Sequence, residues 1–295
     1  MSHFLAPVFE TGFFDSDAVR TAVIVGAVVA LLSGGLGVFT VMRRQSFAAE
    51  ALGDVDTTGG SGAFLVGAGP LWGFLASGVL AAGAMELVGI QRTRGRDLAT
   101  GIVLAAALGL AALFLYFDTT VHDTTGAAQT VLFGSIFTIT GSTIPLVAVL
   151  AFVVVAIMLV IHRPLLLSTV SPEIATARGV PVRLLGVAYL LALAFAVALC
   201  ALTIGSILST ALLVGPAAAA LRVSKRPGRA ILAAALLGAA SMWLGIVLAY
   251  DSYYWPPKGT GWPVSFFVVT IVFVIYLLSG VPGWRERRRA RGGRG

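Results

Sequence analysis

Long, nearly uncharged runs of apolar residues dominate the chain. Eight of these runs can be recognised, at residues 18–42, 66–90, 98–117, 143–161, 184–204, 205–222, 230–249 and 262–281. A helix of about 20 apolar residues crosses the hydrocarbon core of a bilayer and satisfies its own backbone hydrogen bonds. The pattern therefore predicts an all-α fold, a polytopic transmembrane helical bundle. We expect residues 1–17 to form an N-terminal segment, 18–281 the membrane domain, and 282–295 a basic tail.

Composition agrees with a location in lipid. The 295 residues are 58% hydrophobic and 11% charged, with a mean hydropathy of +0.96, which leaves too few polar side chains to cover a soluble protein of this size. The first twenty residues lack a basic stretch, so we expect no cleavable signal peptide, and the first span serves as the targeting signal. The single cysteine, Cys200, lies in an apolar run, which excludes an internal disulfide and favours a small core residue.

The basic residues predict how the chain is oriented. Lys and Arg concentrate in short loops beside the spans and in the tail, which is typical of a cytoplasmic membrane face that can contact anionic lipid. Although the net charge is +7, this distribution argues against nucleic-acid binding. With the tail inside, eight spans alone would place Arg43 and Arg44 outside. A further crossing by residues 45–65 leaves only Arg20 and Lys258 of the twenty basic residues outside. We therefore expect nine crossings, an external N-terminus and a cytoplasmic C-terminus.

Residues 45–65 are too polar and too rich in glycine to face lipid, so as a crossing they must be wrapped by other helices or line a watery path. Within them, Glu50 and Asp54 share one helix face about 6 Å apart, with Asp56 just beyond. Carboxylates at membrane depth need a compensating cation or proton, and hard oxygen ligands favour Mn²⁺, Fe²⁺ or a similar ion. The alternative is a cytoplasmic loop whose acidic side chains are solvated.

Two segments carry distinctive motifs: residues 205–220 read GSILSTALLVGPAAAA, and residues 43–52 read RRQSFAAEAL. The first resembles the G-x-L-L-x-x-A-L-L-V-x-P-A-A-x-A span of the zinc and manganese ABC permeases, a family of high-affinity metal importers. The second resembles the R-R-x-S-F-x-x-[DE]-A-L motif of the same family. Residues 132–136, LFGSI, belong to the same resemblance, which runs from about residue 18 to 281. It implies an ABC metal-permease fold.

The resemblance also implies where the metal passes. It aligns Glu50 with the family's pathway acid and Asp54 with a pathway histidine, so Glu50, Asp54 and the neighbouring Asp56 become the candidate translocation path. Because Asp54 stands where the family has a histidine, zinc is disfavoured as the transported ion, and a harder divalent ion is the more plausible substrate. The family's following L-P-G is absent, and residues 57–60, TTGG, stand in its place.

Residues 171–179, SPEIATARG, predict a short helix between two spans, with Ser171 as its cap, Pro172 at its first position and Gly179 at its end. The E-x-A-x3-G spacing of Glu173, Ala175 and Gly179 resembles the loop by which ABC permeases dock on their ATPase; the alternative is a plain interhelical turn.

Other residues carry more modest expectations. Gly215 and Pro216 predict a structural kink where a neighbouring helix approaches closely. Residues 126–142 predict a short half-helix or interfacial segment. Asp118, His122 and Asp123 are expected in an external loop, which contacts a binding protein, is solvated or receives the metal. His162 is expected at the membrane interface. Glu86 is expected to pair with Arg92 or Arg94, or to line the exit of the path.

The sequence contains no G-x4-G-K-[ST] phosphate loop, so ATP that drives transport is expected to be hydrolysed on another chain, and no bound cofactor is expected. The resemblance implies a homodimeric permease in a bacterial cytoplasmic membrane, with a cytoplasmic ATPase partner and an external metal-binding protein. The alternatives are a proton-coupled secondary transporter of a cation, an intramembrane enzyme, whose G-x-S-x-G or H-E-x-x-H motifs are absent, or a structural membrane partner.

Overall fold

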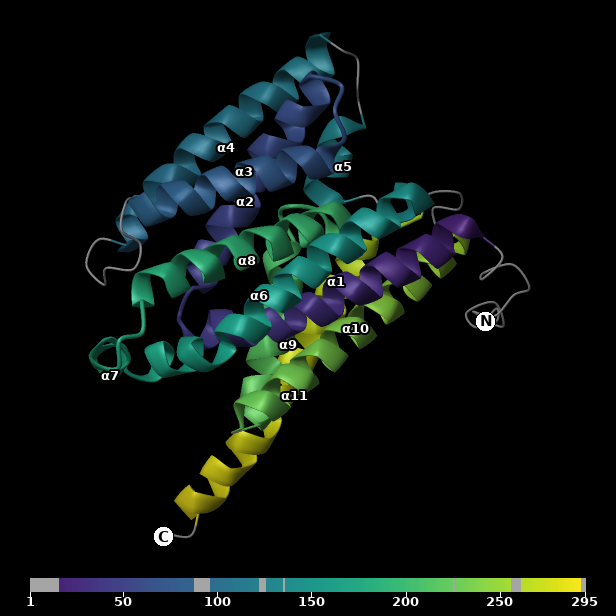
Figure 1. Ribbon diagram of the computed structural model, residues 1–295. Helices are drawn as coiled ribbons and strands as arrows, with labels where there is room; N and C mark the ends of the chain where they lie inside the picture. Colours follow the sequence, from purple (N-terminus) through teal and green to yellow (C-terminus); the bar gives the residue numbers. More distant parts are fainter. Residues whose placement is uncertain are drawn as a thin grey trace.

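A computed structural model describes residues 16–87, 96–121, 126–134, 136–224, 226–255 and 261–292, and every regular element in these ranges is helical (Figure 1). The α-helices are α1 (Asp17–Met42), α2 (Ser46–Leu65), α3 (Pro70–Leu87), α4 (Arg96–Val121), α5 (Ala127–Phe133), α6 (Ile144–Val170), α7 (Pro172–Ala177), α8 (Val182–Ile204), α9 (Ser209–Val223), α10 (Pro227–Asp251) and α11 (Val264–Gly292). Short 3-10 turns lie at Ile136–Thr138 (η1), Gly141–Thr143 (η2) and Ser252–Tyr254 (η3). The predicted all-α fold is confirmed.

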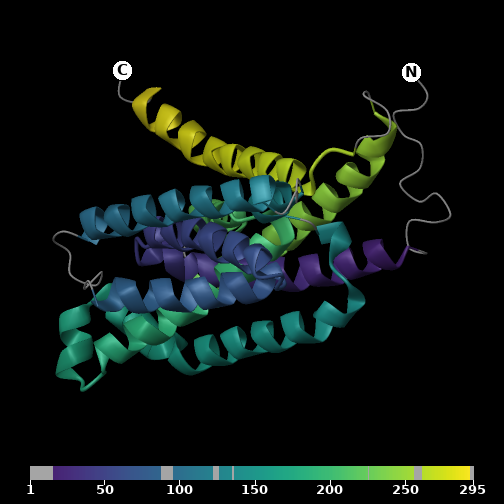
Figure 2. The same cartoon turned by 90° about the horizontal axis from the view of Figure 1, so that it is seen from above.

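Each predicted apolar run contains one long helix, and the polar residues 45–65 form the 20-residue helix α2. Two boundaries differ from the prediction because the backbone turns at a glycine: α3 begins only after Gly67 (φ 69°), and α9 begins only after Gly205 (φ 88°). Of residues 126–142, those that the structure describes include α5 and η1, and η2 begins at Gly141, which agrees with the predicted short half-helix. Helix α11 continues to Gly292, so the basic tail extends the last helix beyond the bundle (Figures 1 and 2).

Helix α8 lies at the centre of the bundle. From Ala192 to Ile204 nearly every side chain is buried, and most are small, so neighbouring helices approach it on all sides. Helices α2, α3 and α4 lie on one side of α8, and α1, α9, α10 and α11 on the other (Figure 1). Five helices, α1, α4, α6, α8 and α10, contain stretches long and apolar enough to cross a membrane unaided. Helix α2 is more polar and depends on its neighbours.

Small residues set the closest helix contacts. A Cβ atom added to Gly37 in α1 would overlap the Leu213 carbonyl oxygen of α9, and one added to Gly34 would lie 2.5 Å from the Ala234 carbonyl oxygen of α10. Gly59 of α2 and Gly73 of α3 press against each other in the same way. Without a hydrophobic driving force in lipid, such close backbone packing is what holds membrane helices together.

Candidate functional site

Helix α2 carries the predicted path residues and is enclosed by its neighbours. It begins after a sharp reversal of the chain, where Arg44 adopts a left-handed backbone conformation (φ 55°). Helices α3, α4, α5, α8 and α9 all contact it, and its buried positions include Ala49, Leu52 and Thr57. The structure therefore wraps this polar helix in protein, as the sequence predicted for a crossing that cannot face lipid.

Glu50 and Asp54 lie one turn apart on a half-buried face of α2. On one side of this face, a Cβ atom at Gly53 would lie 2.7 Å from Ser209 Oγ of α9. On the other side, Thr58 Oγ1 donates a 2.7 Å hydrogen bond to the Ala107 carbonyl of α4. Because successive residues turn by about 100° around a helix, the two carboxylates face the space between α9 and α4, and Asp54 lies roughly 12 Å along the axis from the start of α2. The rest of the chain thus shields the pair only in part.

Asp56 does not join this pair. It is two residues beyond Asp54, which directs it to the opposite side of the helix, and its side chain is fully buried against α3. Ser77 Oγ donates a 3.1 Å hydrogen bond to Asp56 Oδ1, whereas Oδ2 has no hydrogen-bond partner in the part of the chain that the structure describes. The sequence grouped the three acids together, and the structure separates them because a spacing of two residues reverses the face of a helix.

A chain of polar contacts, which the sequence did not predict, links α2 to the turns beside it. Thr57 Oγ1 donates a 2.7 Å hydrogen bond to Ser206 Oγ, and Ser206 donates through its amide (3.0 Å) and hydroxyl (3.1 Å) to the Val131 carbonyl of α5. Gly134 and Gly205, both with positive φ, pack backbone to backbone at this point. The LFGSI segment and the GSILSTALLVGPAAAA segment therefore meet, although about 70 residues separate them along the chain.

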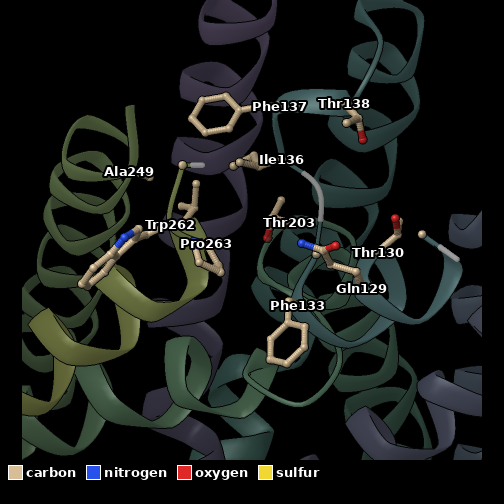
Figure 3. Close-up of a pocket in the computed structure, with 14 residues that line it drawn as sticks. Gln129, Thr130, Phe133, Ile136, Phe137, Thr138, Thr203, Ala249, Trp262 and Pro263 are labelled. Carbon is tan, nitrogen blue, oxygen red and sulfur yellow. The ribbon is translucent and has the colours of Figure 1, made fainter. Parts of the chain in front are cut away.

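A cavity of about 390 Å³ opens where α5, the end of α8, the end of α10 and the start of α11 meet (Figure 3). Figure 3 shows Gln129 and Thr130 on one side, Trp262 on the other and Thr203 between them. All its lining residues are uncharged. The charge pattern of the loops predicts that this end of the bundle faces the outside. The lining combines apolar side chains, among them Phe133 and Trp262, with the polar side chains of Gln129, Thr130 and Thr203.

The structure corrects the placement of Asp118. The sequence predicted an external loop, but α4 continues four residues past the predicted end at residue 117, so Asp118 lies in its last turn and is fully buried. His122 and Asp123 lie outside the described residues. Among the residues that are described, no group of three or more His, Cys, Asp or Glu side chains is placed to hold a metal ion.

Two other predicted polar residues have defined partners. Glu86, near the end of α3, accepts a 3.0 Å hydrogen bond and ion pair from Arg183 Nε of α8. Its predicted partners Arg92 and Arg94 lie outside the described residues. His162 lies in α6 with Nδ1 2.7 Å from the Leu159 carbonyl oxygen, at a half-exposed position.

Helix α7 has the compact form that its sequence predicted. The Ser171 hydroxyl accepts a 3.4 Å hydrogen bond from the Ile174 amide and caps the helix, and Gly179 ends the segment with φ 74°. Ala175 is fully buried, which anchors α7 against α6 and α8, while Glu173 is exposed. The result is a compact, capped projection at the end of the bundle that the charge pattern predicts to face the cytoplasm.

The predicted kink residues lie within α9. Pro216 is inside the helix and buried, which removes one backbone donor from the helical ladder. A Cβ atom on Gly215 would overlap Val272 of α11, so this glycine permits the close approach that the sequence predicted. Gly215 and Pro216 therefore contribute to the packing of α9 and do not lie beside the carboxylates of α2.

Comparison with known proteins gives concordant results. The profile of the ABC 3 transport family matches residues 15–280. The manganese transport system membrane protein MntC of Listeria innocua is 26% identical over 243 residues, covering 82% of this chain and 85% of its own length. MntC of Halalkalibacterium halodurans is 27% identical over 247 residues, covering 82% and 84%. The solved structure of PsaBC from Streptococcus pneumoniae in complex with Fab superposes with a TM-score of 0.74 at 22% identity, covering 91% of this chain and 93% of that one, which supports the fold.

Proposed function

Since this chain belongs to the ABC 3 transport family and is the permease subunit of an ATP-driven metal importer, we propose that its cargo is Mn²⁺ and that the ion crosses the bilayer along the Glu50–Asp54 face of α2. The family assignment sets aside the proton-coupled transporter, the intramembrane enzyme and the structural partner as alternatives. The chain is a multi-pass protein of the cytoplasmic membrane, and ATP hydrolysis belongs to a separate partner.

One observation carries the choice of path: two carboxylates stand one turn apart and half-buried in a helix that is otherwise enclosed, and the sequence predicts that this helix crosses the membrane. A charged side chain in that position is costly unless a cation or water compensates it. The oxygen-only donors suit Mn²⁺ better than zinc, which favours nitrogen and sulfur ligands. The manganese transport proteins among the relatives support the same ion.

A second copy of the chain would complete the site. Two carboxylates fall short of the coordination that a hard divalent ion requires, and the described part of one copy offers no larger cluster. In a dimer with two-fold symmetry the same face of α2 from each copy would point at a shared path, which brings four carboxylates together. We infer that the permease is a homodimer and that the ion passes between its two copies.

The partners would bind at opposite ends. The exposed Glu173 and the compact helix around Ala175 and Gly179 suit docking of the cytoplasmic ATPase, because a rigid projection transmits movement without absorbing it. The external metal-binding protein would deliver its ion at the other end, above the cavity lined by Gln129 and Trp262. The ion itself is the substrate, and no resident cofactor is proposed.

The path is tested by replacing each carboxylate in turn. We expect Glu50→Ala and Asp54→Ala to lower ATP-dependent Mn²⁺ uptake by at least about tenfold in vesicles that contain the permease and its ATPase, because a path ligand is lost. Size-exclusion chromatography should show an intact complex. Asp17→Ala, which removes an exposed carboxylate at the start of α1, serves as the matched control and should transport normally. Unchanged Mn²⁺ accumulation in both path variants would refute the assignment.

A further inference from the structure

Arg43 joins the start of the acid-bearing helix to the arm that carries α7. Its Nη1 donates to Ser168 Oγ and to Thr169 Oγ1, each at 3.3 Å. Ser168 and Thr169 form the last turn of α6, and Ser171, the cap of α7, follows two residues later. One end of the guanidinium therefore holds the base of the α6–α7 arm.

Arg43 also contacts the residue that precedes α2 and the central helix α8. Its Nε donates a 3.3 Å hydrogen bond to Gln45 Oε1, and Gln45 is the buried residue that immediately precedes α2. The guanidinium also lies over the ring of Tyr189 in α8, 5.2 Å from the centroid, and the Tyr189 hydroxyl is 2.8 Å from Thr40 Oγ1 of α1. The one side chain thus touches the α1–α2 reversal, the end of α6 and the central helix α8.

Arginine suits a mechanical connection of this kind. The guanidinium is planar and permanently charged, and its donors are fixed in direction, so it holds several acceptors in one geometry. Glu50 is the fifth residue of α2 and lies about one helical turn from the start of that helix. The hydrogen bonds of Arg43 therefore connect the end of α6 to the residue that precedes α2.

We propose that Arg43 is a positioning residue that couples movement of α7 to the Glu50–Asp54 face of α2, so that closure of the ATPase reorients the metal path. The inference rests on the proposed function, because it assumes that the ATPase docks at α7. Arg43 itself lies at the cytoplasmic end of α2 and contacts no ion. Its loss should separate ATP hydrolysis from transport and leave both partners bound.

The test compares uptake with hydrolysis in the same vesicles. For the assembled permease–ATPase complex, we expect Arg43→Gln to lower the Mn²⁺ moved per ATP by about tenfold, while hydrolysis stays within about twofold of wild type. Arg43→Lys, which keeps a charged donor without the fork, should be intermediate. Arg163→Gln removes an exposed arginine from α6 and should leave the ratio unchanged. An unchanged ratio in Arg43→Gln, or a parallel loss of uptake and hydrolysis, would overturn the proposal.

Two further measurements keep the result decisive. If Arg43→Gln fails to assemble, Ser168→Ala combined with Thr169→Val removes the acceptors instead and should lower the same ratio. Spin labels introduced by Thr176→Cys in α7 and Phe47→Cys in α2, both exposed positions, report the distance between the two helices whatever the cargo. Trapping with ATP and vanadate should change this distance in wild type and not in Arg43→Gln. If the distance between the labels changes equally in wild type and Arg43→Gln, or does not change in wild type, the coupling role of Arg43 is refuted. If the distance changes in wild type but the complex takes up no Mn²⁺, only the proposal that Mn²⁺ is the cargo is refuted.

Discussion

At the scale of single residues, helix geometry decides which acids belong together. Glu50 and Asp54, four residues apart, share a half-buried face of α2, whereas Asp56 points into the contact with α3. Ser77 donates to one oxygen of Asp56, and the other oxygen has no partner in the described ranges. A charge on this buried side chain would be costly, and the side chain packs against α3 away from the Glu50–Asp54 face, so Asp56 is expected to act in the contact with α3 and not in transport.

Replacing Asp56 by asparagine tests this division. Asparagine keeps the volume and the acceptor for Ser77 and removes the charge, so we expect Asp56→Asn to melt at the wild-type temperature or higher and to transport Mn²⁺ normally. Ser77→Ala removes the donor and should destabilise the protein by about 1 kcal/mol. Thermal unfolding in detergent and uptake in vesicles measure the two effects. A folded Asp56→Asn permease without uptake would place Asp56 in the path.

The sequence predicted some of these residues and missed others for a physical reason. The i, i+4 spacing of Glu50 and Asp54 is local, and helix geometry alone gives their common face. The partners Ser77, Ser206 and Arg183 come from distant parts of the chain, and no local pattern indicates them. Asp118 was placed in a loop because hydropathy falls there, although the helix continues.

At the scale of elements, glycine contacts fix how the helices meet. Gly134, after α5, and Gly205, between α8 and α9, both have positive φ and face each other across their backbones. A Cβ atom on Gly205 would overlap the Leu132 carbonyl oxygen, so a side chain has no room. The Ser206 hydrogen bonds to Val131 lie beside this contact. The crossing joins two segments of the family resemblance into one structural unit next to α2.

A single methyl group on Gly205 should disrupt the backbone contact between Gly134 and Gly205. We expect Gly205→Ala to lower the free energy of unfolding by about 3 kcal/mol, because it combines left-handed backbone strain with overpacking. Gly83→Ala in α3 is the matched control, since a Cβ atom there meets nothing within 4 Å, and helix propensity favours the alanine. Apparent melting temperatures in detergent compare the two variants. Equal melting temperatures would show that the protein stays stable when the backbones at Gly134 and Gly205 move apart.

The elements themselves were largely predictable from the sequence. The length of the apolar runs predicted the long helices, and Ser171, Pro172 and Gly179 predicted the start and the end of α7. Helix ends were less predictable: hydropathy does not register a turn such as the one at Gly205, or the point at which α11 leaves the bundle. Local backbone conformation sets those ends, and it depends on contacts with other helices.

At the scale of the whole molecule, the order of helices around α8 was not predictable, because every apolar helix can pack against any other in lipid. The arrangement leaves the Glu50–Asp54 face of α2 only partly covered. Large apolar side chains elsewhere are exposed, for example on α4 and α6, where Leu113, Phe152 and Val160 face outward. Lipid can cover these apolar surfaces, whereas it cannot cover carboxylates, which favours a second copy or water beside α2.

Mixing subunits tests whether two copies share one path. If each copy supplies a required ligand, co-expressing wild type and Asp54→Asn in equal amounts should lower Mn²⁺ uptake to about one quarter, because random pairing leaves that fraction of dimers with both aspartates. Independent monomers would retain about half, and a dimer that needs one aspartate about three quarters. The same mixture with Asp17→Asn controls for expression. A hard divalent ion takes about six oxygen ligands, so the one-quarter outcome would show that both copies supply carboxylates to it, whereas about half or three quarters would refute a path that needs both.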